Sequence, residues 1–124
     1  MTRLDKDIKK QVEDYLTYKQ NQGKLIFFRL NTGDIIIQGE KTRRFKGCGI
    51  TGASDLLVIR ARTRSLFFPP SPRVAMDYSE NIFIECKSDT GKQTPAQRHF
   101  QKLVEEMCCQ YILARKLEDV SGVI

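Results

Sequence analysis

The amino-acid sequence predicts an α/β fold in which a mixed β-sheet is flanked by helices, in the order α-β-β-β-α-β. Three features support this: an amphipathic helical pattern near the start, short apolar runs rich in β-branched residues in the middle, and a capped amphipathic pattern followed by a last apolar run. A chain of 124 residues buries about two-thirds of its unfolded surface, which is enough for one core. We therefore expect residues 1–124 to form a single domain.

An amphipathic helix is expected over residues 4–20, where apolar side chains recur at helical spacing until Asn21-Gln22-Gly23 ends the pattern. The apolar positions are Ile8, Val12, Tyr15 and Leu16. Asp5 projects onto the same face. A buried acid is costly unless it meets a cation, a donor or a metal, so Asp5 either belongs to a site or lies in a first turn that frays.

Two strands, residues 25–30 and 35–38, are expected to pair as a hairpin through a turn at Asn31-Thr32-Gly33-Asp34. Basic residues then lead into a glycine-rich segment, residues 47–52. They are Lys41, Arg43, Arg44 and Lys46. Such side chains and exposed amides can grip the phosphates of a nucleic acid, although the segment is also unremarkable as a solvated loop and matches no nucleotide-binding loop.

Two further apolar runs end beside acidic residues. Asp55 precedes a buried strand at 56–59, and Glu85 follows a strand at 82–84. Because side chains alternate along a strand, Glu85 and Lys87 emerge on one face and Cys86 on the other. An acid-x-Lys tripeptide is weak by itself, since Asp7-Ile8-Lys9 has the same form and a surface salt bridge explains it equally well. The two buried strands make a shared site the stronger interpretation.

These residue types suit a magnesium-dependent nuclease. Mg²⁺ takes oxygen ligands and keeps several waters, so Asp55 and Glu85, with the Cys86 backbone carbonyl as a third ligand, suffice to hold it beside a substrate phosphate. Bound metal lowers the pKa of a water and polarises the phosphoryl oxygen. The Lys87 ammonium can orient that water and offset developing charge.

Residues 60–80 stand apart from the other segments. Prolines in Leu66-Phe67-Phe68-Pro69-Pro70 exclude a central strand there, and the exposed aromatics indicate a surface that a partner covers. A second helix is expected to begin at Thr94, with Pro95 in its first turn, and a last strand at 111–114. The apolar face of that helix is formed by Phe100, Leu103, Val104 and Met107.

The composition favours a phosphate-rich partner. The chain has 21 Lys and Arg against 15 acids, a net charge of +6, although solubility alone is a simpler explanation of this excess. No apolar stretch approaches the length of a membrane span, and the charged start lacks the apolar centre of a secretory signal. We expect no membrane association and a cytoplasmic protein.

With these residues assembled, the chain resembles the VRR-NUC family, the virus-type replication-repair nucleases of the PD-(D/E)xK superfamily, which have a restriction-endonuclease-like fold. Several ordered blocks, spread over nearly the whole chain, carry the resemblance. They are Arg29-Leu30-Asn31-Thr32-Gly33, Gly49-Ile50-Thr51-Gly52-Ala53-Ser54-Asp55-Leu56, Ile84-Glu85-Cys86-Lys87, Thr94-Pro95-Ala96-Gln97 and Tyr111-Ile112-Leu113-Ala114-Arg115.

The resemblance implies a set of roles. Asp55 and Glu85 bind Mg²⁺ or Mn²⁺, Lys87 assists the attacking water, and Gln97 supports the site from the second helix. The glutamate that the family carries on its first helix corresponds to Asp5, which is one methylene shorter, so Glu13 is an alternative. We add Arg29 and Asn31 to the expected DNA-binding residues.

The chain also departs from the family pattern. Residues 67–78 exceed what compact stand-alone members carry, and the glycine often found before the last strand is replaced near Cys109-Gln110. Stand-alone phage and bacterial members resemble Holliday-junction resolvases and act as homodimers. We therefore expect a structure-specific endonuclease for branched DNA in a bacterial or phage-infected cell, and a homodimer to whose interface residues 62–78 contribute. The alternatives are a restriction-like duplex nuclease and a non-catalytic basic DNA-binding protein.

Overall fold

The computed structural model describes residues 3–30, 34–37, 43–46 and 48–124. Its elements in chain order are α1 (Arg3–Asn21), β1 (Ile26–Arg29), β2 (Asp34–Ile37), β3 (Arg43–Lys46), β4 (Leu56–Leu66), β5 (Val74–Cys86), α2 (Pro95–Glu106), β6 (Gln110–Ala114) and α3 (Glu118–Ser121). The α/β class expected from the sequence is confirmed.

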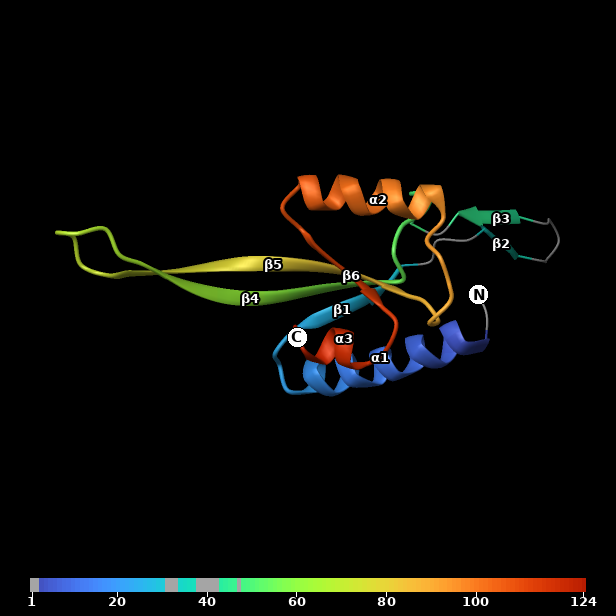
Figure 1. Ribbon diagram of the computed structural model, residues 1–124, viewed down its shortest axis with the longest axis horizontal. Coiled ribbons are helices and arrows are strands. Elements are labelled where there is room, and N and C mark those ends of the chain that lie inside the picture. The colour runs from blue at the N-terminus through green and yellow to red at the C-terminus, as the bar shows by residue number, and fades with distance from the viewer. Residues whose placement is uncertain (1–2, 31–33, 38–42, 47) are drawn as a thin grey trace.

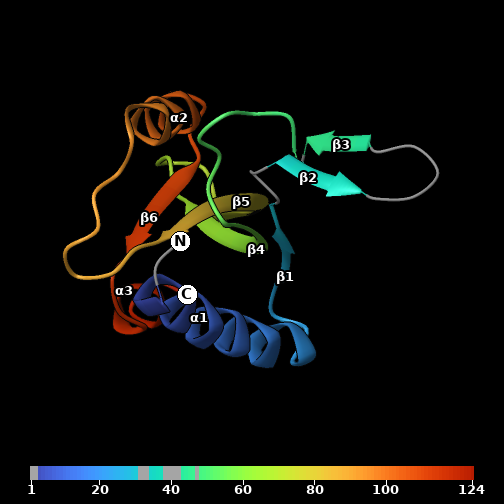
Figure 2. The same ribbon diagram turned by 90° about the vertical axis from the view of Figure 1, so that its right-hand side faces the viewer.

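A four-stranded mixed sheet forms the centre of the molecule. Its strand order is β1-β4-β5-β6. The pairs β1–β4 and β4–β5 are antiparallel, whereas β5 and β6 run parallel because α2 connects them. Strands β2 and β3 pair with each other in a separate two-stranded sheet. Helix α2 lies over one face of the central sheet, and α1 and α3 lie over the other (Figure 2).

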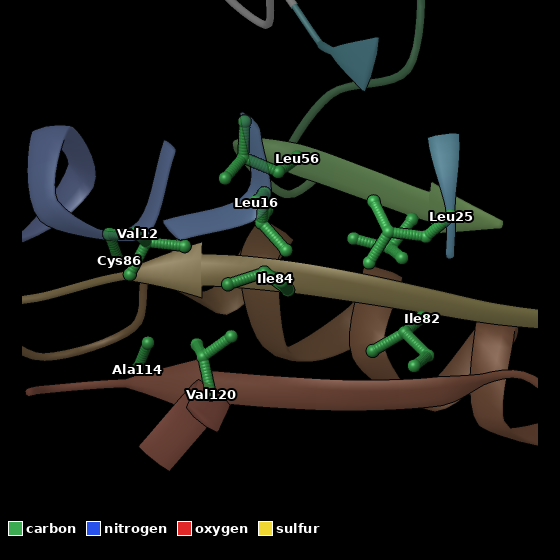
Figure 3. Packing of buried hydrophobic residues seen from close by; sticks show 10 residues of the cluster. Val12, Leu16, Leu25, Leu56, Ile82, Ile84, Cys86, Ala114 and Val120 are labelled. Carbon is green, nitrogen blue, oxygen red and sulfur yellow. The ribbon is translucent and has the colours of Figure 1, made fainter. Parts of the chain in front are cut away.

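Most of the core lies between the sheet and α1 (Figure 3). Alternate residues of the two central strands point into it and meet the apolar side of α1. These buried residues include Val12, Leu16, Leu56, Val58, Ile82, Ile84 and Cys86. A smaller cluster lies under α2, where Phe100 packs edge-on against Phe83 with ring centroids 5.2 Å apart. The sheet is thus apolar on both faces, as an α/β fold requires.

The first helix, the second helix and the last strand lie where the sequence predicted them. The predicted hairpin of residues 25–30 with 35–38 is wrong: β1 pairs with β4, and β2 pairs with β3. The turn at 31–33 lies outside the described residues. Pairing with β4 brings Leu25, which is 6% exposed, and Phe27 against the main core, and this burial outweighs a local turn signal.

The sequence excluded a central strand around the prolines of residues 60–80 and assigned no structure to the rest, which is mostly regular strand. Strand β4 continues to Leu66 and β5 begins at Val74, and every residue of β4 pairs with a residue of β5. The first residue of β1 pairs with Ile59 and the first residue of β6 pairs with Ile82, so within the described residues the ribbon beyond these positions has no sheet neighbour. It projects from the body as a two-stranded arm, with the prolines confined to its tip (Figure 1). We call residues 60–80 the arm.

Within the described ranges, no helix is both long enough and apolar enough to cross a membrane.

Candidate active site

Two acids face each other at the end of the central strands. Leu56 pairs with Ile84 across β4 and β5, so the next position of the same register sets Asp55 opposite Glu85. Both carboxylates are buried, with 8% of Asp55 and 4% of Glu85 exposed. The Cys86 backbone N–H donates to Asp55 Oδ2 over 2.8 Å and holds that side chain in place. The adjacent strand ends therefore bring together the acids that the sequence singled out.

Lys87 and Gln97 reach the same carboxylate. Lys87 Nζ lies 3.8 Å from Glu85 Oε1, and Gln97 Nε2 donates to that oxygen over 3.1 Å. Gln97 is held by a capping box, because its side-chain oxygen accepts from the Thr94 N–H while its own N–H donates to Thr94 Oγ1. The first turn of α2 thus presents a fixed amide donor to Glu85.

Asp5 joins this region from α1. It is 6% exposed, and it accepts a hydrogen bond from the backbone N–H of Ser88, the residue after Lys87. A frayed first turn is therefore ruled out, since α1 begins at Arg3. The alternative residue, Glu13, forms an ion pair with Arg29, with Glu13 Oε2 3.1 Å from Arg29 Nε.

The expected DNA-binding residues are only partly placed. The Arg29 side chain is 63% exposed and forms an ion pair with Glu13. Asn31 and Lys41 lie outside the described residues. Arg43, Arg44 and Lys46 belong to β3, which pairs with β2.

Burial and mutual repulsion govern the charge of the acid pair. Desolvation, and then the nearby Asp55 carboxylate, raise the pKa of Glu85 to about 8, against smaller opposing effects of Lys87 and Lys9. Burial also raises the pKa of Asp55, although the Cys86 N–H opposes it. A metal cation bound between two buried acids would favour their charged forms.

The donor set fits a hard divalent cation. Glu85 Oε2 is buried without a hydrogen-bond partner among the described residues, so one oxygen of the pair remains available as a ligand. Within those residues, no group of three or more His, Cys, Asp or Glu side chains is arranged to hold a metal ion. Two carboxylates match the requirement of Mg²⁺, which keeps several waters and takes the rest of its ligands from substrate phosphate. The Cys86 side chain points into the main core, which leaves only its backbone for the third ligand expected from the sequence.

Two further residues fix the structure around this site, and the sequence had not marked either of them as functional. Arg115, just after β6, donates through Nη1 to Ser88 O at 2.6 Å and Gly91 O at 2.8 Å, and so fixes the loop that follows Lys87. Gly52 has a φ of +80°, and a Cβ there would collide with the backbone of Ala96 in the first turn of α2. These contacts could not be predicted from the sequence, because a single Arg after a strand and a Gly in a glycine-rich loop do not indicate which distant residues they meet.

The raised pKa of Glu85 predicts an unusual pH dependence of stability. Since its ordinary pKa is 4.5 and its folded pKa is about 8, the folded state binds more protons between these values, and the free energy of unfolding falls as the pH rises through them. In metal-free buffer, the Tm of the wild type should therefore decrease from pH 5 to pH 9 more steeply than that of Glu85→Gln. Added Mg²⁺ at pH 8 should raise the Tm of the wild type and leave that of Glu85→Gln nearly unchanged.

The exposed Glu106→Gln is the matched control for this measurement. It should follow the wild-type curve with and without Mg²⁺. If the Tm of Glu85→Gln fell with pH as steeply as that of the wild type, the group responsible for the pH dependence would not be Glu85.

Comparison of the chain with models of known protein families, with curated proteins and with solved structures finds no match.

Proposed function

We propose that this protein is a metal-dependent endonuclease that hydrolyses phosphodiester bonds in branched DNA, as a Holliday-junction resolvase does. The observation that carries the proposal is the acid pair, Asp55 opposite Glu85, with Lys87 Nζ 3.8 Å from Glu85 Oε1. We also propose that the fold is restriction-endonuclease-like and that the chain is a member of the VRR-NUC family. The α/β sheet and the residues of the resemblance support this.

Each residue of the site has a distinct part in this proposal. Asp55 and Glu85 hold the Mg²⁺ or Mn²⁺ ion, which supplies charge stabilisation and a water of lowered pKa. Lys87 donates to the attacking water or to a phosphate oxygen where negative charge develops. Gln97 keeps Glu85 in place through its 3.1 Å hydrogen bond, and Asp5 holds the backbone of Ser88 beside Lys87.

A cleavage assay tests this function against its alternatives. Purified protein is incubated with a four-way junction, a flap and a linear duplex, with Mg²⁺, with Ca²⁺ and with EDTA. We expect cleavage of the junction in Mg²⁺ only. Preferred cleavage of the linear duplex would point to a restriction-like enzyme, and binding of DNA without cleavage in any metal would point to a non-catalytic basic protein. We place this activity in the cytoplasm of a bacterial or phage-infected cell.

We further propose that two copies act together. One chain contributes one acid pair, and two symmetric cuts on opposite strands of a junction need two such sites related by a two-fold axis. Light scattering at micromolar concentration should give twice the mass of one chain. A monomer at these concentrations would exclude the homodimer.

A further inference from the structure

The arm has two unlike faces. Its register places Arg62 opposite Tyr78, Arg64 opposite Met76 and Leu66 opposite Val74. Directly paired residues of antiparallel strands share a face, and positions two apart along each strand return to it, so these six side chains lie together. We call them the Arg face. The opposite face carries only smaller side chains, namely Ala61, Thr63, Ser65, Ala75, Asp77 and Ser79.

The arm carries an excess of uncompensated positive charge. It contains four Arg and two acids. Glu80 is shared between Arg60 at 3.0 Å and Arg62 at 3.6 Å, and Asp77 lies on the opposite face with a 2.6 Å hydrogen bond from Thr63. Within the described residues Arg64 has no acidic partner. The Arg face therefore carries positive charge from Arg62 and Arg64 beside the apolar side chains of Leu66, Val74 and Met76.

The tip of the arm adds exposed aromatic rings. Phe67 is 57% and Phe68 68% exposed, and the Arg73 guanidinium lies 5.9 Å from the centre of the Phe67 ring. None of the arm residues belongs to either core cluster, so packing of the body does not require these side chains. Large apolar side chains beside unpaired Arg on a projecting ribbon indicate a surface made for a partner.

Charge decides which partner fits this surface. A two-fold contact between two Arg faces would bring Arg62 and Arg64 of both copies into one interface, with only the shared Glu80 of each copy to offset their charge. A nucleic acid offers the complement, a row of phosphates for the Arg and flat bases for the rings. The Arg face is thus a poor fit to the homodimer interface in which the sequence had placed it.

We infer that the arm is a DNA-binding β-ribbon, in which Arg62 and Arg64 contact phosphates while Phe67 and Phe68 at the tip stack on bases. Two-stranded ribbons enter DNA grooves, and apolar side chains can wedge between base steps. The inference rests on the proposed function, because it names how the substrate is held beyond the site. From Glu85 to Val74 the strand spans up to roughly 36 Å, about one helical turn of duplex DNA.

The geometry also fits a branched substrate. At the base of the arm, the Arg face continues the α1 side of the sheet, where Leu56 and Val58 lie, whereas Glu85 and Asp55 occupy the α2 side. A straight duplex seated at the acid pair runs along one side of the sheet. DNA that branches or bends can reach the acid pair and the arm together.

The experiment measures binding of a fluorescent four-way junction in Ca²⁺ by anisotropy, at several salt concentrations. The stem variant is Arg62→Gln/Arg64→Gln, the tip variant is Phe67→Ala/Phe68→Ala, and the control is Lys102→Gln/Lys116→Gln. The control removes two positive charges from exposed positions on the body. Thermal unfolding and light scattering are recorded for every protein, and all should unfold like the wild type because the arm lies outside the core.

The stem and tip variants should fail in different ways. We expect the stem variant to lose about tenfold in affinity and to lower the slope of log K against log salt by about 2, since each Arg releases about one counterion. The tip variant should lose about tenfold with an unchanged slope, because stacking on bases releases no counterions. The control should stay within about twofold of the wild type.

Three results would overturn the inference. Stem and tip variants that bind the junction like the wild type would show that the arm does not contact DNA. A tip variant that becomes a monomer from a dimeric wild type would assign the aromatics to a protein interface. A wild type that binds no junction would remove the proposed function as well, and this outcome is recognised without any variant.

Discussion

Replacing Asp55 by Asn, or Glu85 by Gln, should abolish cleavage and leave DNA affinity unchanged. Each substitution keeps the shape of the side chain and removes the charge that holds the metal. In Asp55→Asn, the amide oxygen can still accept the hydrogen bond that Asp55 Oδ2 takes from Cys86, so the strand ends need not move. Affinity is governed by Lys and Arg contacts to phosphates, which these changes leave in place. Single-turnover cleavage of a junction in saturating Mg²⁺, with binding measured in Ca²⁺, checks both parts.

Asp14→Asn is the matched control, since Asp14 is 68% exposed and pairs with Lys10 on the surface of α1. It should cleave at the wild-type rate. We expect the two site variants to fall below about one hundredth of that rate, a loss of at least about 2.7 kcal/mol of transition-state stabilisation. A faster rate in either variant would show that the metal is held elsewhere.

Removal of the Lys87 ammonium should slow cleavage by at least about a hundredfold with little change in affinity. The side chain is only 15% exposed and lies beside Glu85, so it is positioned to act on charge at the reacting phosphate and not on the outer surface of the DNA. Loss of an interaction that strengthens only in the transition state lowers the rate and leaves binding of the substrate unchanged. Lys87→Ala should therefore bind the junction in Ca²⁺ like the wild type.

The neighbouring Lys92 provides a contrast, because it is exposed on the loop after Lys87. Lys92→Ala is expected to alter affinity at most and to leave the rate at saturating DNA unchanged. If Lys87→Ala lost affinity and rate in equal measure, Lys87 would instead be a phosphate clamp that binds the ground state.

Local patterns were sufficient for the two long helices, α1 and α2, and for the direction of the site residues, whereas the short helix α3 was not predicted. The apolar spacing of Val12 and Leu16 predicted α1, and Thr94 with Pro95 predicted the start of α2, because helical periodicity and capping depend on residues a few positions apart. The alternation along β5 likewise placed Glu85 and Lys87 on one face. These inferences need no knowledge of the rest of the chain.

Strand partners depended on contacts distant in sequence. The turn signal at residues 31–33 predicted a hairpin, yet β1 pairs with β4, because that partner completes the sheet over α1. The prolines excluded a central strand at residues 66–70, but nothing in the sequence predicted that β4 and β5 continue past their sheet neighbours and carry this segment as the tip of a long ribbon. The free energy of a local turn or strand preference is small compared with that gained when a distant partner buries apolar surface.

The site, too, depends partly on local sequence patterns and partly on contacts between distant segments. Residue type and strand alternation marked Asp55, Glu85 and Lys87 as a set, but the register of β4 on β5 sets the two acids opposite each other. The grip of Arg115 on the loop after Lys87, and the close fit of Gly52 against α2, arise where three separate stretches of chain meet. A one-dimensional pattern records which groups are available, whereas hydrogen bonds and close packing between distant segments depend on their arrangement in space.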